Sequence, residues 1–338
     1  SIKLTKGKNM NNFKKIGLTA LAGSLALMSV AQAEVVLSGS SEATYSSSDE
    51  SVTGNPIGFS NDLNIDATGE FNNGFTYTAH LNFAGQDMAA DSNSLVIGMG
   101  DLGSIGIDQG VELFGISGMT NFGNPSAYEE ADHGVSTLDD QLDANASGVI
   151  GYNGSFAGVS ISIEYQPTTA ATVQEAGAFS GAGSTASNVN FMVSASVPGL
   201  DGLTLAAGHS QDNNDIAGTI EDREMTMGAR YTMGNVTAGY QISEIQSGTG
   251  DADGYNGTFY GVAVNVNENF SVSYNVADLE VDKTGAAAVN VTEESTGISA
   301  AYSMGSASVR FSYNEADNVG GVTGVKDDNT ELSLALAF

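Results

Sequence analysis

The sequence predicts an all-β protein whose strands close into an antiparallel barrel that spans a membrane. Short runs in which apolar and polar residues alternate recur along the chain, as expected of strands with different surroundings on their two faces. The connections between these runs alternate between short and long. No segment after residue 33 is long and apolar enough for a transmembrane helix. A membrane-spanning chain without such helices has to close its strands, because every backbone polar group needs a partner within the chain.

Residues 10–33 are expected to form a signal peptide. They contain two lysines near their start, an apolar stretch at 16–30 and the small-residue sequence Ala-Gln-Ala at their end. Cleavage after Ala33 would leave Glu34 as the mature N-terminus. A membrane anchor is the alternative, but an apolar stretch of about 15 residues is short of the ~20 that a spanning helix needs. Residues 1–9 are interpreted as a leader remnant or a mis-called start.

The rest of the chain is strongly acidic. Five of the ten basic residues precede Glu34, whereas all forty acidic residues lie in residues 34–338. These residues therefore carry a net charge of −35. Nucleic acid is excluded as a partner, because its recognition requires a basic face. The chain has no cysteine, so disulfides cannot stabilise it. Abundant glycine, together with frequent Val, Ile, Tyr, Phe and Thr, favours strands joined by turns.

Alternation is clear in many places, for example from Phe75 to Phe83, where the odd-numbered residues are apolar and the even-numbered residues are polar. The last strand ends with Leu332, Leu334, Leu336 and Phe338 at alternate positions. A single domain over residues 34–338 is expected. Its sixteen predicted strands are 35–45, 59–71, 75–84, 93–100, 103–108, 147–153, 159–166, 188–197, 203–211, 224–233, 235–245, 255–266, 270–278, 292–304, 307–315 and 329–338.

The predicted connections fall into two classes. Short ones include Asn72-Asn73-Gly74 and Gly305-Ser306, whose composition is that of hairpin turns. Long ones are predicted at 46–58, 85–92, 109–146, 167–187, 212–223, 246–254, 279–291 and 316–328. Tight turns on one rim, long loops on the other and an even number of strands are typical of bacterial outer-membrane barrels. Fourteen or eighteen strands remain open alternatives.

At this point the chain resembles the general diffusion porins of Gram-negative bacteria, especially the acidic sixteen-stranded trimeric porins of alphaproteobacteria. The resemblance rests on an ordered set of features: a signal ending in Ala-Gln-Ala, a first strand from Glu34, a hairpin at Ser94–Asp108 and a closing strand that ends in Phe338. It implies a homotrimer in contact with outer-membrane lipid and lipopolysaccharide. Phe338 resembles the signal that the outer-membrane assembly machinery recognises.

The connection at 109–146 has neither strand alternation nor a helix pattern. Structureless stretches of this length are usually functional or disordered. We expect this one to fold into the lumen and narrow the pore, which is the role that the resemblance implies for the third loop. Many relatives line the opposite wall with Arg and Lys, whereas the first nine predicted strands here contain none. The candidate constriction residues are Glu112, Glu129, Glu130, Asp132, Asp139, Asp140 and Asp143.

The residues of the pore wall follow from strand parity. A charged side chain that faces lipid near the midplane costs ~2–4 kcal/mol for Arg, so charged residues on the strands are expected to face the lumen. Carboxylates around a pore favour cations. We also considered that Arg230 and Arg310 face the loop acids across the narrow part of the pore. The candidate wall residues are Glu42, Asp62, Asp66, Glu70, His80, Asp108, Glu164, Arg230 and Arg310.

The sequence therefore predicts a pore for passive diffusion of ions and small hydrophilic solutes, with a preference for cations. Alternatives are a substrate-specific channel whose binding track uses His80, Phe114, Phe122 and Tyr128, and an acidic surface adhesin that transports nothing. No nucleophile–base pair indicates an enzyme, and the three histidines, widely separated in sequence, form no metal motif. No cofactor is expected, apart from Ca²⁺ held by clustered carboxylates in the acidic loops.

Overall fold

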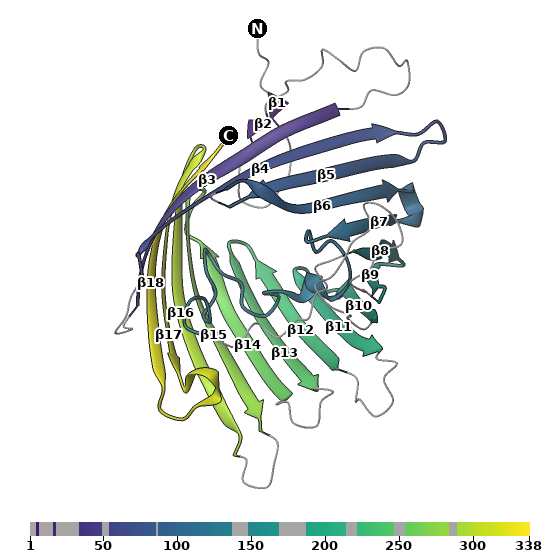
Figure 1. Cartoon of the computed structure of the whole chain (residues 1–338). Coiled ribbons are helices and arrows are strands. Elements are labelled where there is room, and N and C mark those ends of the chain that lie inside the picture. Colours follow the sequence, from purple (N-terminus) through teal and green to yellow (C-terminus); the bar gives the residue numbers. More distant parts are fainter. Residues whose placement is uncertain are drawn as a thin grey trace.

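The computed structural model describes residues 5–6, 16–17, 34–48, 54–85, 87–136, 148–168, 187–213, 222–246, 254–283 and 289–338. In these residues, sixteen strands from β3 to β18 form one closed antiparallel barrel, which confirms the predicted fold class (Figure 1). Two short strands near the N-terminus, β1 (Thr5–Lys6) and β2 (Ile16–Gly17), form a separate pair.

Each barrel strand corresponds to one predicted strand. The strands are β3 (Glu34–Ser48), β4 (Ile57–Glu70), β5 (Thr76–Ala84), β6 (Ala89–Gly98), β7 (Ser104–Gln109), β8 (Val149–Phe156), β9 (Val159–Gln166), β10 (Ser187–Ser196), β11 (Leu203–Asn213), β12 (Arg223–Met233), β13 (Val236–Gln246), β14 (Gly254–Asn265), β15 (Phe270–Asp282), β16 (Val291–Met304), β17 (Ala307–Asp317) and β18 (Lys326–Ala337).

The largest differences from the predicted boundaries lie on the long-loop rim. The connection predicted at 85–92 is shorter, because β6 already begins at Ala89 and pairs Ala89 with Ala84. A register shift between Leu81 and Phe83 breaks the alternation there, which hid the start of the strand. β18 likewise begins three residues before the predicted start, in a polar stretch without alternation.

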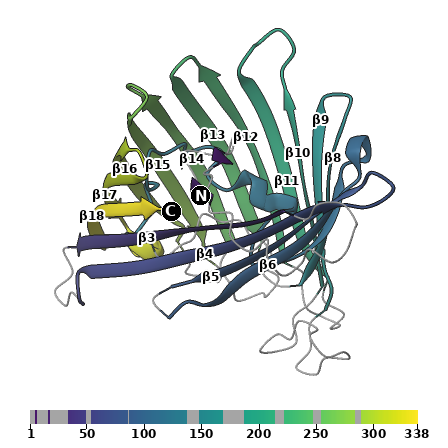
Figure 2. The same cartoon turned by 90° about the horizontal axis from the view of Figure 1, so that it is seen from above.

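The barrel closes between its first and last strands, which run side by side in Figures 1 and 2. β18 pairs with β3 from Asn329 opposite Ser48 to Ala337 opposite Ser40. The terminal Phe338 then exchanges two backbone hydrogen bonds of 2.9 Å with Gly39. Closure leaves no unpaired strand edge, which is the condition for a sheet in a membrane.

Strand register shows which residues share a face, because directly paired residues point to the same side of a sheet. Asp66 pairs with His80, His80 with Ser94, Ser94 with Asp108, and Asp108 with Val149. The same face continues around the barrel and returns to β3. All nine candidate wall residues, namely Glu42, Asp62, Asp66, Glu70, His80, Asp108, Glu164, Arg230 and Arg310, lie on it.

The opposite face is apolar and exposed. On β18 it carries Leu332, Leu334 and Leu336, and on β12 it carries Met225 and Met227, all of which are exposed. A continuous apolar outer surface of this kind is far larger than soluble proteins display, and it suits a barrel whose outer face contacts lipid.

Three short 3-10 helices complete the secondary structure in the described segments: η1 (Gly100–Leu102), η2 (Gly115–Met119) and η3 (Val319–Gly321). Among the described residues, no helix has the length and apolar character needed to cross a membrane. Residues 110–136, here called the inner segment, run inside the ring of strands after β7 (Figures 1 and 2).

Candidate functional site

The inner segment begins at a buried carboxylate. Asp108, at the end of β7, is 1% exposed, and its two oxygens accept hydrogen bonds from the backbone N–H groups of Val111 (2.9 Å) and Leu113 (2.7 Å). The sequence assigned Asp108 to the pore wall, and it does lie on the inward face. Its carboxylate fixes the turn into the segment.

Phe114 anchors the next residues by packing against a flat part of the wall. Its side chain is 1% exposed and lies over Gly106 and Gly151. A Cβ atom at Gly151 would lie only 2.0 Å from Cγ of Phe114. Two inward glycines on neighbouring strands therefore leave the space that the ring fills.

The helix η2 is held by polar side chains of two strands. The N–H of Gly115 donates to Oγ of Ser162 (2.7 Å), and the N–H of Ile116 donates to Oδ1 of Asn190 (2.9 Å). The amide of Asn190 in turn donates to Glu164, which is 1% exposed. Glu164, a predicted wall residue, is therefore covered by the inner segment and supports its anchor.

Apolar side chains of the segment form a core against the wall. Ile116, Met119 and Phe122 pack with Ala206 and with Met192. Phe114 and Phe122, which is 7% exposed, are both buried. This burial contradicts their assignment to the binding track of a substrate-specific channel, because a solute in the lumen cannot reach them.

Arg230 of β12 holds the inner segment from the wall side. Its Nε donates to the carbonyl oxygen of Phe122 (2.9 Å), its Nη2 donates to the carbonyl oxygen of Asn121, and its guanidinium carbon lies 4.7 Å from the centre of the Phe122 ring. The proposal that Arg230 faces the loop acids across the lumen is therefore wrong. A guanidinium group presents several donors in a fixed plane, which suits two successive carbonyls.

Beyond Phe122 the backbone of the segment is hydrogen-bonded to one strand after another. The N–H of Gly123 donates to Gln241 (2.9 Å), that of Ala127 to Ser273 (2.9 Å) and that of Tyr128 to Ser299 (3.0 Å). These acceptors lie on β13, β15 and β16 respectively. The segment thus follows the inner wall rather than crossing the open lumen.

Tyr128 connects the segment to the seam of the barrel. Its hydroxyl lies 3.2 Å from Glu42 and hydrogen-bonds to Glu331. Burial raises the pKa of its phenol, so the hydroxyl stays protonated. Arg310 lies with its guanidinium carbon 4.4 Å from the centre of the Tyr128 ring and forms an ion pair with Glu42. Arg310 therefore also does not oppose the loop acids across the lumen.

The predicted constriction acids have different surroundings. Glu112 is exposed. Glu129 lies 3.4 Å from Nδ1 of His133, and burial raises the pKa of its carboxyl group. Glu130 accepts a hydrogen bond from Asn121, and burial raises its pKa to about 7. Asp132 is half-buried. The remaining three acids, Asp139, Asp140 and Asp143, lie outside the described residues.

The wall from β3 to β5 carries further acids on its inward face. Asp62 accepts a hydrogen bond of 3.1 Å from Ser40, and Asp66 lies 2.7 Å from Nδ1 of His80. Glu70 is exposed at the end of β4. Within the described parts of these three strands the inward face has no Lys or Arg, so its charge is negative.

Comparison with protein families agrees with this architecture. The family model of the Gram-negative porins matches residues 17–291, which is most of the chain. The chain belongs to the Gram-negative porin family. Membership confirms the resemblance noted in the sequence, and it identifies the protein as an outer-membrane β-barrel that forms a channel. A search of curated proteins gives no match.

Several solved structures share the fold of this porin at low sequence identity. OmpF of Salmonella typhi in complex with daunomycin has a TM-score of 0.69 at 13% identity, covering 90% of this chain and 98% of that one. A trimer form of Vibrio cholerae OmpT has a TM-score of 0.67 at 13% identity, covering 90% and 99%. A mutant of the Rh. blastica porin has a TM-score of 0.60 at 17% identity, covering 90% and 100%.

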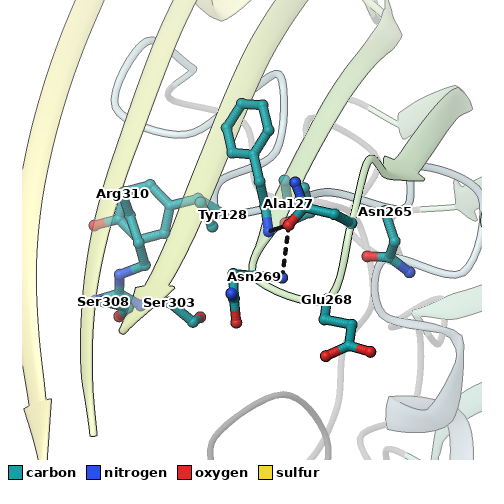
Figure 3. A pocket seen from close by; sticks show the side chains of 12 residues that line it. Ala127, Tyr128, Asn265, Glu268, Asn269, Ser303, Ser308 and Arg310 are labelled. Atoms are coloured by element: carbon teal, nitrogen blue, oxygen red, sulfur yellow. Dashed lines mark hydrogen bonds between the residues drawn. The ribbon is translucent and has the colours of Figure 1, made fainter. Parts of the chain in front are cut away.

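One hollow of the porin lies between the inner segment and the short-turn rim (Figure 3). It has a volume of about 320 Å³, and its walls include Tyr128, Arg310, Asn265, Asn269 and Glu268. Amide, hydroxyl and charged groups share its lining with apolar groups such as those of Ala127, Phe270 and Ala301.

Sequence reasoning missed most of the groups that hold the inner segment, among them Asn190, Gln241, Ser273, Ser299 and Glu331. A usable signal was present in the inward glycines, where the segment or its side chains approach the wall closely. These are Gly151, Gly208, Gly228, Gly239, Gly261 and Gly297.

The three histidines do not come together in the described residues, but the barrel brings His133 next to Glu129 and Glu331. The spacing of four residues between Glu129 and His133 was visible in the sequence. The contribution of Glu331, far along the chain, was not. The acidic loops proposed to hold Ca²⁺ lie partly outside the described residues.

Proposed function

We propose that this porin is a water-filled, cation-preferring channel for passive diffusion of ions and small hydrophilic solutes, narrowed by the inner segment. The observation that carries the proposal is the path of that segment along the inward face, where Glu129 lies beside His133 and Glu331 and where Tyr128 contacts both Glu42 and Glu331. Glu130 and Asp132 belong to the same stretch of the segment. Carboxylates that surround a pore in a low-dielectric wall attract cations and repel anions.

The state of the two arginines on the inward face strengthens this proposal. Arg230 is covered by the backbone of the inner segment, and Arg310 is paired with Glu42. Neither leaves an isolated positive charge that could attract anions. His133, which can also carry a positive charge, is flanked by Glu129 and Glu331.

In the proposed channel, Glu129, Glu130 and Asp132 would set the selectivity, together with Glu112 and the further acids of residues 137–146. Asp62, Asp66, Glu70 and His80 would line the opposite wall. Asp108 and Glu164 have a different role, because they are buried and fix the inner segment in place.

We further propose that three copies associate through the outer face of β3 and β4. The small residues Gly39, Ser41 and Ala43 lie on that face, and Oγ of Ser41 donates a hydrogen bond of 2.7 Å to Asn61 on the same face. A polar pair is costly against lipid and suits contact with protein. The Vibrio cholerae relative is described as a trimer. A signal peptide at 10–33 and assembly through Phe338 are parts of the same proposal.

Solute flux into liposomes tests this function. Vesicles containing the purified protein should admit a small amine faster than a neutral sugar of similar size, and the neutral sugar faster than a small carboxylate. Flux should rise in proportion to solute concentration without saturation. Faster passage of the carboxylate would overturn the cation preference, and saturable flux of one solute would favour the substrate-specific alternative.

A further inference from the structure

Three potential metal ligands meet where the inner segment reaches β18. In the turn at 131–135, the N–H of His133 donates to the carbonyl oxygen of Glu130 at 3.3 Å. This turn brings Nδ1 of His133 within 3.4 Å of a carboxylate oxygen of Glu129, while Nε2 lies 4.0 Å from an oxygen of Glu331. One ligand atom from each of the three residues lies within 4.8 Å of the other two.

Neighbouring groups hold the side chain of Glu331 and the backbone of His133 in position. The Tyr128 hydroxyl engages one oxygen of Glu331, while the other oxygen of Glu331 faces His133. The carbonyl oxygen of His133 accepts a hydrogen bond of 3.0 Å from Asn314. Hydrogen bonds that orient the ligands are a regular feature of metal sites, where they fix the direction of each donor atom.

The position is open to water and negatively charged. The side chains of His133, Glu129 and Glu331 are 40%, 20% and 12% exposed. Glu42, Glu130 and Asp132 lie in the same region, with Arg310 as the opposing cation. A cation in the lumen can therefore reach the three donors and is attracted by the surrounding field.

The ligand types select among cations. Ca²⁺ and Mg²⁺ prefer sites built from oxygen alone. An imidazole nitrogen with two carboxylate oxygens suits Zn²⁺ or a similar divalent transition metal, with water completing the coordination. Bonds of ~2.0–2.2 Å require donor atoms roughly 3.3 Å apart. The Glu129–His133 pair already has this spacing at Nδ1. Glu331 lies beside Nε2, so its side chain has to move toward Nδ1 to supply the third donor.

We propose that Glu129, His133 and Glu331 bind a divalent transition-metal ion such as Zn²⁺ inside the barrel. The bound ion would neutralise two carboxylates of the narrow part of the pore and reduce cation current. Binding itself depends only on the geometry of the three residues, whereas the effect on current rests on the proposed function.

Equilibrium dialysis of the full-length protein in detergent against ZnCl₂ tests binding. We expect one His133-dependent Zn²⁺ per chain, with affinity reduced by roughly tenfold or more in His133→Gln and in Glu331→Gln. A large excess of CaCl₂ should leave this ion bound. The matched control is His80→Gln, because His80 also lies beside a carboxylate, Asp66, but belongs to no three-donor cluster in the described residues.

Equal Zn²⁺ binding by the wild type and His133→Gln would overturn the site, as would displacement by Ca²⁺. Strand content measured by circular dichroism and the heat-dependent mobility of the barrel on gels show whether each variant is folded. Glu129→Gln provides a second ligand variant if one of the others fails to fold.

Single-channel recording separates the site from the proposed function. Zn²⁺ added to the bath should reduce the current of the wild type and leave that of His133→Gln unchanged. His133-dependent binding without any change in current would uphold the metal site, and it would contradict the placement of this turn in the ion path.

Discussion

Arg310 of β17 forms an ion pair with Glu42 of β3, across the intervening strand β18. The two residues lie on the inward face, next to the ring of Tyr128 from the inner segment. The pair therefore lies where the seam of the barrel meets the inner segment. It also explains how a wall with an arginine can keep a negative field, because the charge of that arginine is offset locally.

Arg310→Gln should increase the preference for cations. The substitution removes the positive charge that opposes Glu42. A unit charge about 4–8 Å from the ion path is worth about 0.5–1 kcal/mol in water-like surroundings. Its removal favours K⁺ and disfavours Cl⁻ by that amount each, so the permeability ratio of K⁺ to Cl⁻ should rise by roughly five- to thirtyfold. The ratio follows from reversal potentials measured in a KCl gradient. Lys326→Gln is the control, because it removes an equal charge from an exposed pair with Asp317. An unchanged ratio in Arg310→Gln would show that this pair lies away from the ion path.

Arg230→Lys should loosen the inner segment while keeping the charge. Lysine cannot reproduce the planar arrangement with which Arg230 reaches the carbonyl oxygens of Asn121 and Phe122. Loss of such hydrogen bonds costs about 1–3 kcal/mol of local stability. We expect larger fluctuations of the open-channel current and faster proteolysis within the segment. Current noise equal to that of the wild type would contradict the anchoring role.

Gly151→Ala should destabilise the porin through Phe114. The new methyl group would overlap the ring, since Cβ would lie 2.0 Å from Cγ of Phe114. Overpacking of this kind costs about 1–3 kcal/mol. Urea unfolding in detergent measures the loss. Gly54→Ala is the control, because a Cβ at Gly54 meets nothing within 4 Å.

Combining Gly151→Ala with Phe114→Ala tests the cause of that loss. The double variant should lose less free energy of unfolding than the two single losses added together, because removal of the ring relieves the overlap. Strictly additive losses would mean that Gly151 is needed for a reason other than contact with Phe114.

Acidification should reduce the preference for cations. The pKa of Glu130 is raised to about 7, mainly by burial, so its carboxylate loses its charge as the pH falls through neutrality. The pKa of His133 is raised, chiefly by its interaction with Glu331, so the imidazole also gains a positive charge as the pH falls. Among the neighbouring charges, Glu129, Asp132 and Glu42 are acidic and Arg310 is basic. Both changes make the region more positive at low pH.

Reversal potentials recorded from pH 8 to pH 5 in one KCl gradient measure this effect. In Glu130→Gln the reversal potential should change less with pH. The change that remains should be the one caused by protonation of His133. A preference for cations that grows as the pH falls would contradict the assigned pKa shifts.

The sequence predicted the strands well because their pattern has a single physical cause, the contrast between lipid and water on the two faces. Alternation such as that at Leu332, Leu334 and Leu336 therefore repeats along every strand. Prediction failed at Ala89, where an irregular register removes the alternation. Parity placed the charged residues on the inward face, but it could not tell which of them the inner segment would cover.

The course of the inner segment could not be predicted because its anchors are single side chains far away in the sequence. Asn190 accepts a hydrogen bond from Ile116, which is 74 positions away in the sequence. Glu331 accepts one from Tyr128, which is 203 positions away. Such pairs depend on the order of the strands around the barrel and on the register. Arg230 and Arg310 illustrate the consequence: strand parity places both on the inward face, but it does not reveal that Arg230 binds the inner segment and that Arg310 pairs with Glu42.

The most direct test of an acidic constriction is the reversal potential of single channels in a KCl gradient. The wild type is compared with the triple variant Glu129→Gln, Glu130→Gln and Asp132→Asn. A pore narrowed by these carboxylates gives a wild-type potential on the K⁺ side of zero and a variant potential shifted clearly toward zero. A wild-type potential on the Cl⁻ side, or a variant indistinguishable from the wild type, would contradict an acidic constriction formed by the inner segment.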